Sequence, residues 1–97
     1  MNLKWSQHAL RDLRRLADRI AADKPKAASE FVAALRDKVE ILKRQPLLGR
    51  AAALDDTREL VLHKNYLVTY RLRDDEIQIL QLWHVAQKRP GTLVLTT

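Results

Sequence analysis

The side chains best suited to chemistry lie in the C-terminal half of the chain, and they are Arg58, Arg71, Arg73 and His84. A histidine can transfer protons near neutral pH, and arginines can stabilise a negatively charged phosphorane. A ribonuclease that needs no metal ion combines these groups to activate a ribose 2′-hydroxyl. Metal-independent cleavage of RNA is therefore the catalytic alternative that the sequence offers.

The composition is that of one small, basic, globular domain. The chain has 97 residues, of which 46% are hydrophobic and 31% are charged, with a formal net charge of +6. This balance excludes a disordered chain and suggests an acidic partner. Cysteine is absent, so a disulfide framework and a thiolate metal site are excluded. No apolar run approaches the roughly 20 residues that cross a bilayer, and no signal peptide is evident, so we expect a cytoplasmic protein.

Two stretches have the periodicity of amphipathic helices. The first extends from the capping residue Ser6 to about Ala22, and the second from Pro25 to about Gln45. The connection between them, in which Asp23 can serve as a cap, is so short that the helices must pack as an antiparallel hairpin. The apolar positions expected to be buried are Ala9, Leu13, Leu16, Ala17 and Ile20 in the first helix and Ala28, Phe31, Leu35, Val39 and Leu42 in the second.

Strands are expected to complete the fold. They are Asn2–Trp5, Thr57–Leu62, Tyr66–Arg73 and Glu76–Val85, with a loop at 49–56. The order β-α-α-β-β-β predicts an α+β fold in which a helical hairpin packs on one face of an antiparallel sheet. Residues 1–90 are expected to form this single domain, and residues 91–97 a flexible C-terminal tail.

A two-residue turn at Asp74-Asp75 sets the pairing of the last two strands. Leu72 then faces Ile77, Tyr70 faces Ile79, Arg71 faces Gln78 and Leu67 faces Leu82. The sheet face expected to pack on the helices carries Tyr66, Val68, Tyr70, Leu72, Ile77, Ile79 and Trp83. The opposite face, expected to meet a partner, carries Leu67, Thr69, Arg71, Arg73, Leu80, Leu82 and His84.

This pairing separates Arg71 from His84. Gln78, opposite Arg71, lies roughly 20 Å along the strand from His84. Because acid–base partners must reach the same substrate, we expect no shared active site. Arg71 is instead expected to form a cross-strand ion pair with Glu59 or Glu76. His84 is expected to serve structure or partner contact.

Metal and nucleophilic sites have little support. His8, His63 and His84 lack the spacing of metal ligands. Ser6 and Ser29 do not follow the pattern of a nucleophile elbow. We therefore expect neither a metal nor a cofactor.

A set of short motifs extends over residues 2–90 in one order. They are Trp5-Ser6, Ala9, Asp12-Leu13, Pro25, Ala27-Ala28, Pro46, Gly49-Arg50, Arg58-Glu59-Leu60, Tyr66–Arg71, Ile79-Leu80, His84, Gln87 and Pro90. Together they resemble the RelE/ParE superfamily of toxins. The resemblance implies the toxin of a type II toxin–antitoxin pair, which inhibits growth until the C-terminal segment of an antitoxin wraps and neutralises it.

Departures from the superfamily pattern indicate to which branch of the superfamily the chain is more similar. Many relatives that cut mRNA carry an arginine after the tyrosine that opens the third strand, whereas this chain has Leu67. Its helices balance their charges, and Val85 and Ala86 follow His84 where ribosome-dependent relatives often carry an aromatic or basic group. The resemblance therefore implies a ParE-like toxin, associated with plasmid stabilisation, that poisons DNA gyrase without nuclease chemistry.

Two alternatives remain open. One is a RelE-like, ribosome-dependent endonuclease that cuts mRNA with Arg58, Arg71 and His84, and the other is a basic binding module without toxicity. The residues expected to meet partners are Arg11, Arg14, Arg15, Arg19, Arg71, Arg73 and His84. The arginines should attract acidic residues of the antitoxin in a toxin–antitoxin hetero-oligomer, and apolar patches should accept its amphipathic segment.

Overall fold

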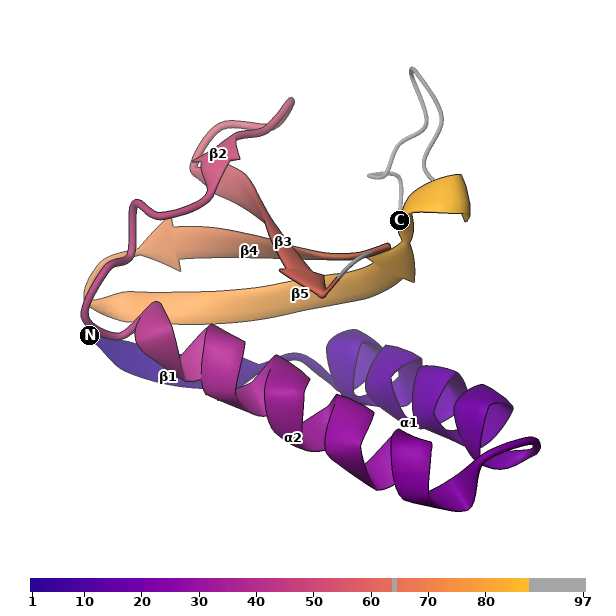
Figure 1. Cartoon of the computed structure of the whole chain (residues 1–97). Coiled ribbons are helices and arrows are strands. Elements are labelled where there is room, and N and C mark those ends of the chain that lie inside the picture. Colours follow the sequence, from indigo (N-terminus) through magenta and orange to yellow (C-terminus); the bar gives the residue numbers. More distant parts are fainter. Residues whose placement is uncertain (64, 88–97) are drawn as a thin grey trace.

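The computed structural model describes residues 1–63 and 65–87, so the tail expected at 91–97 lies outside the described residues. Its elements are β1 (Asn2–Trp5), α1 (Gln7–Ala21), α2 (Pro25–Ile41), β2 (Arg50–Ala51), β3 (Thr57–His63), β4 (Tyr66–Arg73), β5 (Glu76–His84) and the 3-10 helix η1 (Val85–Gln87). The two helices lie together on one side of the sheet (Figure 1). The expected α+β fold, with a helical hairpin on a sheet, is confirmed.

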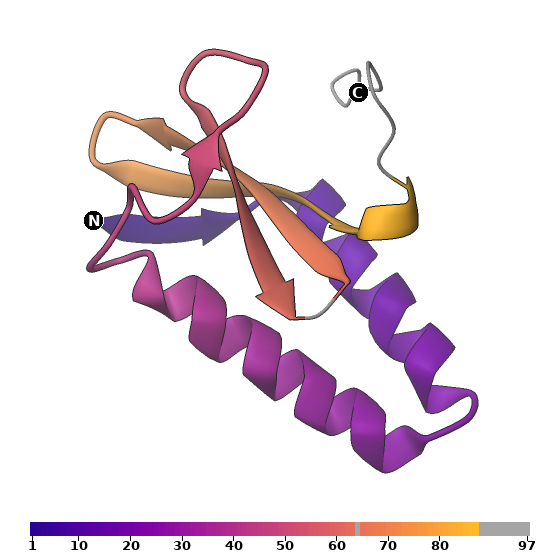
Figure 2. The same ribbon diagram turned by 45° about the horizontal axis from the view of Figure 1, so that its top comes forward.

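Over the described residues, the sheet has five strands in the order β1-β5-β4-β3-β2. Its neighbouring strands are antiparallel except β1 and β5, which run parallel, so the sheet is mixed rather than purely antiparallel. A parallel pair needs a long connection, and here both helices and three strands separate β1 from β5 along the chain. The loop expected at 49–56 contains the short strand β2 (Figure 2).

The two helices begin differently. The Ser6 hydroxyl caps α1 by accepting a hydrogen bond from the Ala9 amide at 3.0 Å, as expected. The residue before α2 is Lys24, whose side chain makes no capping bond, so the expectation that Asp23 caps this helix is wrong. Pro25 occupies the first turn, where its fixed φ favours helix and its missing N–H costs nothing.

The core lies between the helical hairpin and one face of the sheet. All five apolar positions expected of the second helix are buried, and Leu35 is fully buried. In α1, Ala9, Leu13 and Leu16 are buried, whereas Ala17 and Ile20 are half-buried because the helix end extends past the sheet. None of the described helices is long and apolar enough to span a membrane.

The pairing of β4 with β5 follows the prediction near the turn and departs from it farther along. Tyr70 faces Ile79 as expected, but Thr69 faces Gln81, so Leu80 is an extra residue in β5. This β-bulge shifts the register by one residue, and Leu67 faces Trp83 instead of Leu82.

The bulge exchanges the two faces of β5 beyond Leu80, because successive strand residues point to opposite sides. Trp83 was expected to face the helices, but it lies on the opposite face, where its indole N–H donates to the Thr69 hydroxyl at 3.2 Å. Leu82 and His84 turn toward the helices instead, opposite Val68 and Tyr66. The expected positions of Trp83, Leu82 and His84 are therefore wrong.

Candidate functional site

The residues of the catalytic alternative do not converge. Arg71 in β4 faces Gln78, whereas His84 faces Tyr66 at the other end of the same strand pair. The two side chains also lie on opposite faces of the sheet, since Arg71 alternates with Tyr70 and His84 shares a face with Tyr66. The predicted separation of Arg71 from His84 thus agrees with the observed pairing.

Arg58 anchors the loop that follows α2. One guanidinium nitrogen donates to the Gly49 carbonyl at 2.6 Å and lies 3.3 Å from the Leu47 carbonyl. The hydroxyl of Tyr70, which faces Arg58 across β3 and β4, accepts from the Gly49 amide and donates to the Pro46 carbonyl, both at 2.8 Å. We call Arg58, Tyr70 and their bonds to residues 46–49 the loop anchor.

Position 49 requires a glycine because the chain there lies close to the Glu59 backbone and the Tyr70 side chain. A Cβ atom at this position would lie 2.7 Å from both the Glu59 carbonyl oxygen and the Tyr70 hydroxyl. The Glu59 carbonyl oxygen cannot move away without distorting the pairing of β2 with β3. The separate motifs around Pro46, Gly49, Arg58 and Tyr70 therefore form one structural unit.

The Tyr70 phenol has a raised pKa. Burial raises its pKa above the ordinary value of 10.0, and this effect outweighs the lowering by the Gly49 amide and the Arg58 charge. Tyr70 therefore remains a neutral hydrogen-bonding group throughout the physiological pH range.

The arginines of β4 contact neighbouring side chains. Arg71 donates through Nε to the Gln78 side-chain oxygen at 3.0 Å, rather than pairing with Glu59 or Glu76 as expected. Gln78 in turn donates to Glu76 at 2.8 Å. The exposed Arg73 lies 3.9 Å from Asp56, at the limit of an ion pair.

His84 stabilises the end of the last strand. Its Nδ1 accepts a hydrogen bond from the Ala86 amide at 2.9 Å, at the start of η1. Its ring packs edge-on against Tyr66 with centroids 5.1 Å apart, and Tyr66 packs on Phe31 in the same way at 4.8 Å. One imidazole nitrogen is thus engaged in backbone structure.

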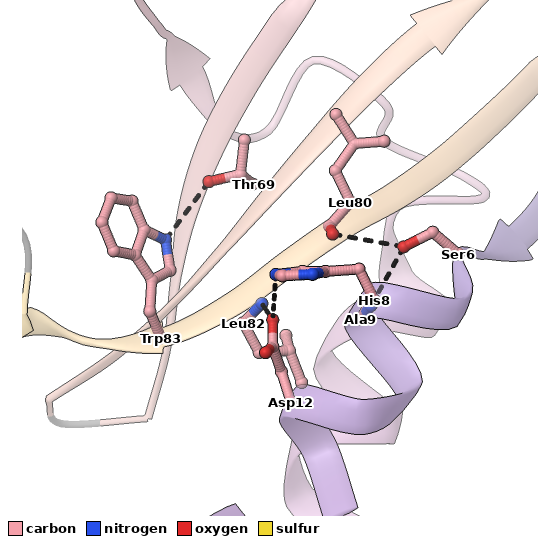
Figure 3. A network of polar contacts seen from close by, with 8 residues as sticks. All are labelled: Ser6, His8, Ala9, Asp12, Thr69, Leu80, Leu82 and Trp83. Carbon is pink, nitrogen blue, oxygen red and sulfur yellow. Dashed lines mark hydrogen bonds and ion pairs between the residues drawn. The ribbon is translucent and has the colours of Figure 1, made fainter. Parts of the chain in front are cut away.

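A second group of polar contacts, which sequence reasoning missed, joins α1 to the bulge of β5 (Figure 3). The Ser6 hydroxyl donates to the Leu80 carbonyl at 3.2 Å, and the Asp12 carboxylate accepts from the Leu82 amide at 3.0 Å. His8 lies 3.4 Å from the same carboxylate oxygen. We call these contacts the helix latch.

The helix latch replaces a missing strand neighbour. The pairing of β1 with β5 ends where Trp5 faces Ile79, so the following edge groups of β5 need other partners. The first turns of α1 supply them, and Asp12 is only 7% exposed. The available sequence signal was the position of Asp12, three residues after Ala9 and four before Leu16, on the buried side of the helix.

The remaining predicted partner residues are the arginines of α1, which are all exposed. They lie on the solvent side of the helix and take no part in the helix latch or the loop anchor. Among residues 1–63 and 65–87, no three His, Cys, Asp or Glu side chains gather as they would around a metal ion.

Comparisons with known proteins agree with this architecture. Residues 3–89 match the family described as the ParE toxin of the type II toxin–antitoxin system parDE. The toxin RelE2 of Caulobacter vibrioides is 31% identical over 83 residues, which cover 86% of this chain and 93% of that protein.

Solved structures show the same similarity. The chromosomal ParDE system of P. aeruginosa contains a chain with a TM-score of 0.80 and 28% identity, covering 88% of this chain and 96% of that one. The toxin–antitoxin complex RelBE2 of Mycobacterium tuberculosis gives a TM-score of 0.55 at 27% identity, with 86% and 95% covered.

The fold and these matches define a toxin of the RelE/ParE superfamily, as the sequence motifs indicated. More narrowly, the chain belongs to the ParE toxin family of type II toxin–antitoxin systems.

Proposed function

We propose that this toxin arrests growth by binding and poisoning DNA gyrase, without nuclease chemistry, until a cognate antitoxin neutralises it. The observation that carries the proposal is Leu67, the position where the superfamily resemblance associates an arginine with mRNA cleavage. Leu67 is only 5% exposed and faces Trp83 across β4 and β5. A hydrophobic side chain packed in this way offers no charge to a scissile phosphate.

The arrangement of the other candidate residues supports the same proposal. Arg58 is committed to the loop anchor, and His84 uses Nδ1 to hold the backbone of η1. Arg71 lies at the opposite end of the strand pair from His84. Residues 3–89 match the ParE family, which is the branch that the superfamily resemblance associates with gyrase, and we propose that the toxin acts on gyrase in the cytoplasm.

The proposed antitoxin contacts combine apolar and basic groups. Several large apolar side chains are exposed on the loops around β2 and on β3, namely Leu47, Leu48, Leu54 and Val61. The loop between β2 and β3 projects away from the helices in both views (Figures 1 and 2). We propose that an amphipathic antitoxin segment covers these groups, and that its acidic residues approach Arg71 and Arg73.

The proposal is tested by two assays run in parallel on the purified toxin. DNA gyrase should lose supercoiling activity as toxin is added, while an in vitro translation reaction should continue at its normal rate. Normal supercoiling at an excess of toxin that arrests growth in cells would reject gyrase as the target.

The RelE-like alternative is kept because a relative named RelE2 is 31% identical to the chain. It assigns mRNA cleavage to Arg58, Arg71 and His84. Changing Arg71 or His84 to alanine should leave toxicity intact under the gyrase proposal. Loss of toxicity in both variants, with unchanged circular dichroism and with codon-positioned mRNA cuts made by the unaltered toxin, would favour the endonuclease.

A further inference from the structure

The exposed side of α1 is more basic than the sequence of the helix suggests. Within α1, four arginines accompany two aspartates, a moderate excess of positive charge. Asp12, however, is turned inward, where its carboxylate accepts the Leu82 amide and is only 7% exposed. Asp18 is then the one exposed carboxylate of the helix.

The four arginines are grouped on one side of the helix. Arg11, Arg15 and Arg19 follow one another at four-residue steps, and Arg14 lies three residues after Arg11. Residues at these steps are neighbours on a helix, and each four-residue step advances about 6 Å along the axis. We call Arg11, Arg14, Arg15 and Arg19 the arginine face.

The arginine face is not neutralised by any residue that the structure describes. Across residues 1–63 and 65–87, none of its guanidinium groups forms an ion pair or a side-chain hydrogen bond. Like charges at four-residue steps destabilise a helix, and Asp18 lies within reach of only part of the group. The arrangement therefore costs stability in the isolated toxin and would be relieved by an external anion.

The chemistry of the arginine face fits phosphates better than a protein surface. Protein interfaces concentrate their affinity in a few buried residues, where arginine is accompanied by tryptophan and tyrosine. Here no aromatic side chain lies among the arginines, and Leu10, which is 44% exposed, is the one large apolar side chain exposed on α1. Guanidinium groups bind phosphates with paired hydrogen bonds, and a row of them follows a nucleic-acid backbone through charge alone.

We propose that the arginine face of α1 binds the phosphate backbone of a nucleic acid without reading its sequence. The inference concerns the isolated toxin and does not depend on gyrase as the target. DNA and RNA offer the same phosphate chemistry, so the experiment distinguishes them as sources.

The test measures binding of the full-length toxin to a fluorescent 20-base-pair DNA duplex and to a single-stranded RNA, over a series of salt concentrations. The variant Arg11→Gln/Arg15→Gln/Arg19→Gln should bind about tenfold or more weakly at low salt. Its slope of log affinity against log salt should fall by about 2–3, because each lost phosphate contact contributes about 0.9 for duplex DNA and about 0.7 for a single strand.

A matched control removes the same charge elsewhere. Lys26, Lys43 and Arg44 are exposed on α2 and just beyond its C-terminal end, and changing all three to glutamine also lowers the net charge by three. This control should retain most of the affinity and the salt slope. Thermal unfolding of both variants checks that the fold is intact.

A preference for DNA or for RNA identifies which nucleic acid supplies the phosphates, and either preference supports the proposal. A toxin that binds neither nucleic acid at low salt overturns it, as does an equal loss of affinity in the variant and the control. A fluorescent poly-glutamate peptide serves as a third ligand. If the toxin binds this peptide more tightly than both nucleic acids, the arginine face recognises an acidic protein and the proposal is wrong.

Discussion

The two helices of the hairpin have similar lengths but different roles. Helix α2 packs through a purely apolar stripe, and its charged side chains, Lys26, Glu30, Arg36, Asp37, Lys38 and Glu40, balance one another. Helix α1 adds a buried carboxylate to its apolar contacts, through Asp12, and displays the arginine face to solvent. Helix α2 thus provides packing, whereas α1 combines packing, strand-edge hydrogen bonds and a charged surface.

This difference shows how a buried polar contact on one side of a helix can change the charge of its solvent side. The Asp12 carboxylate satisfies the edge of β5, and the same inward turn removes a negative charge from the solvent side of α1. Helix α2, without such a contact, keeps its charge balance at the surface.

The largest effect is expected in the apolar stripe of α2. Leu35→Ala should destabilise the protein by about 2–5 kcal/mol, because Leu35 is fully buried and its removal leaves a cavity. Leu10→Ala on α1 removes the same atoms from a side chain that is 44% exposed, and should cost less than about 1 kcal/mol. Urea unfolding measures both values. Equal losses would contradict the burial of Leu35 in the core.

The next effect is expected in the helix latch. Asp12→Ala should destabilise the protein by about 1.5–3 kcal/mol, since the buried Leu82 amide loses a charged acceptor. Asp18→Ala removes the same charge from the exposed side of α1 and should change stability by less than about 0.5 kcal/mol. If thermal unfolding gives the same midpoint for both variants, the helix latch does not hold α1 on the sheet.

A smaller effect is expected where the chain leaves α2. Tyr70→Phe should destabilise the protein by about 1–2 kcal/mol at neutral pH, because the Gly49 amide and the Pro46 carbonyl lose their shared partner. The variant also tests the raised pKa of Tyr70.

Since the folded-state pKa lies above the ordinary value of 10.0, the stability gained by keeping the Tyr70 phenol protonated in the folded state is fully present below pH 10 and is lost as pH rises through the folded-state pKa. The free energy of unfolding should therefore fall more steeply above pH 10 in the unaltered toxin than in the phenylalanine variant. Parallel profiles would show that burial does not perturb this phenol.

The smallest effect is expected on the outer side of α2. Exchanging Lys26 and Glu30 by the double change Lys26→Glu/Glu30→Lys preserves the net charge of an exposed helix surface. Stability should change by less than about 0.5 kcal/mol, and nucleic-acid binding should be unaffected. A clear change in affinity would place α2, as well as α1, in the binding surface.

The sequence predicted the features that depend on residues close together along the chain. The helices, the Ser6 cap and the strand pairing next to Asp74-Asp75 follow from periodicity, capping and turn length, and Asp74 adopts the positive φ of 57° that a tight turn favours. The bulge at Leu80 was not predictable in this way. Its hydrogen-bond partners, Ser6 and Asp12, are about 70 positions away along the chain.

The site was predictable only in part for the same reason. The separation of Arg71 from His84 follows from strand length, but the face of His84 depends on the bulge. The role of Arg58 depends on carbonyl groups of the loop after α2, and no local pattern reveals that contact. Long-range hydrogen bonds thus decide whether a charged residue such as Arg58 is held within the fold.

The most direct test of the proposed gyrase activity is to trap covalent gyrase–DNA complexes. Gyrase, supercoiled plasmid and purified toxin are incubated together, and detergent and protease then reveal DNA breaks. We predict broken plasmid in proportion to added toxin, with none in reactions that lack gyrase. Intact plasmid at a toxin excess that blocks growth in cells would contradict the proposal that this toxin poisons gyrase.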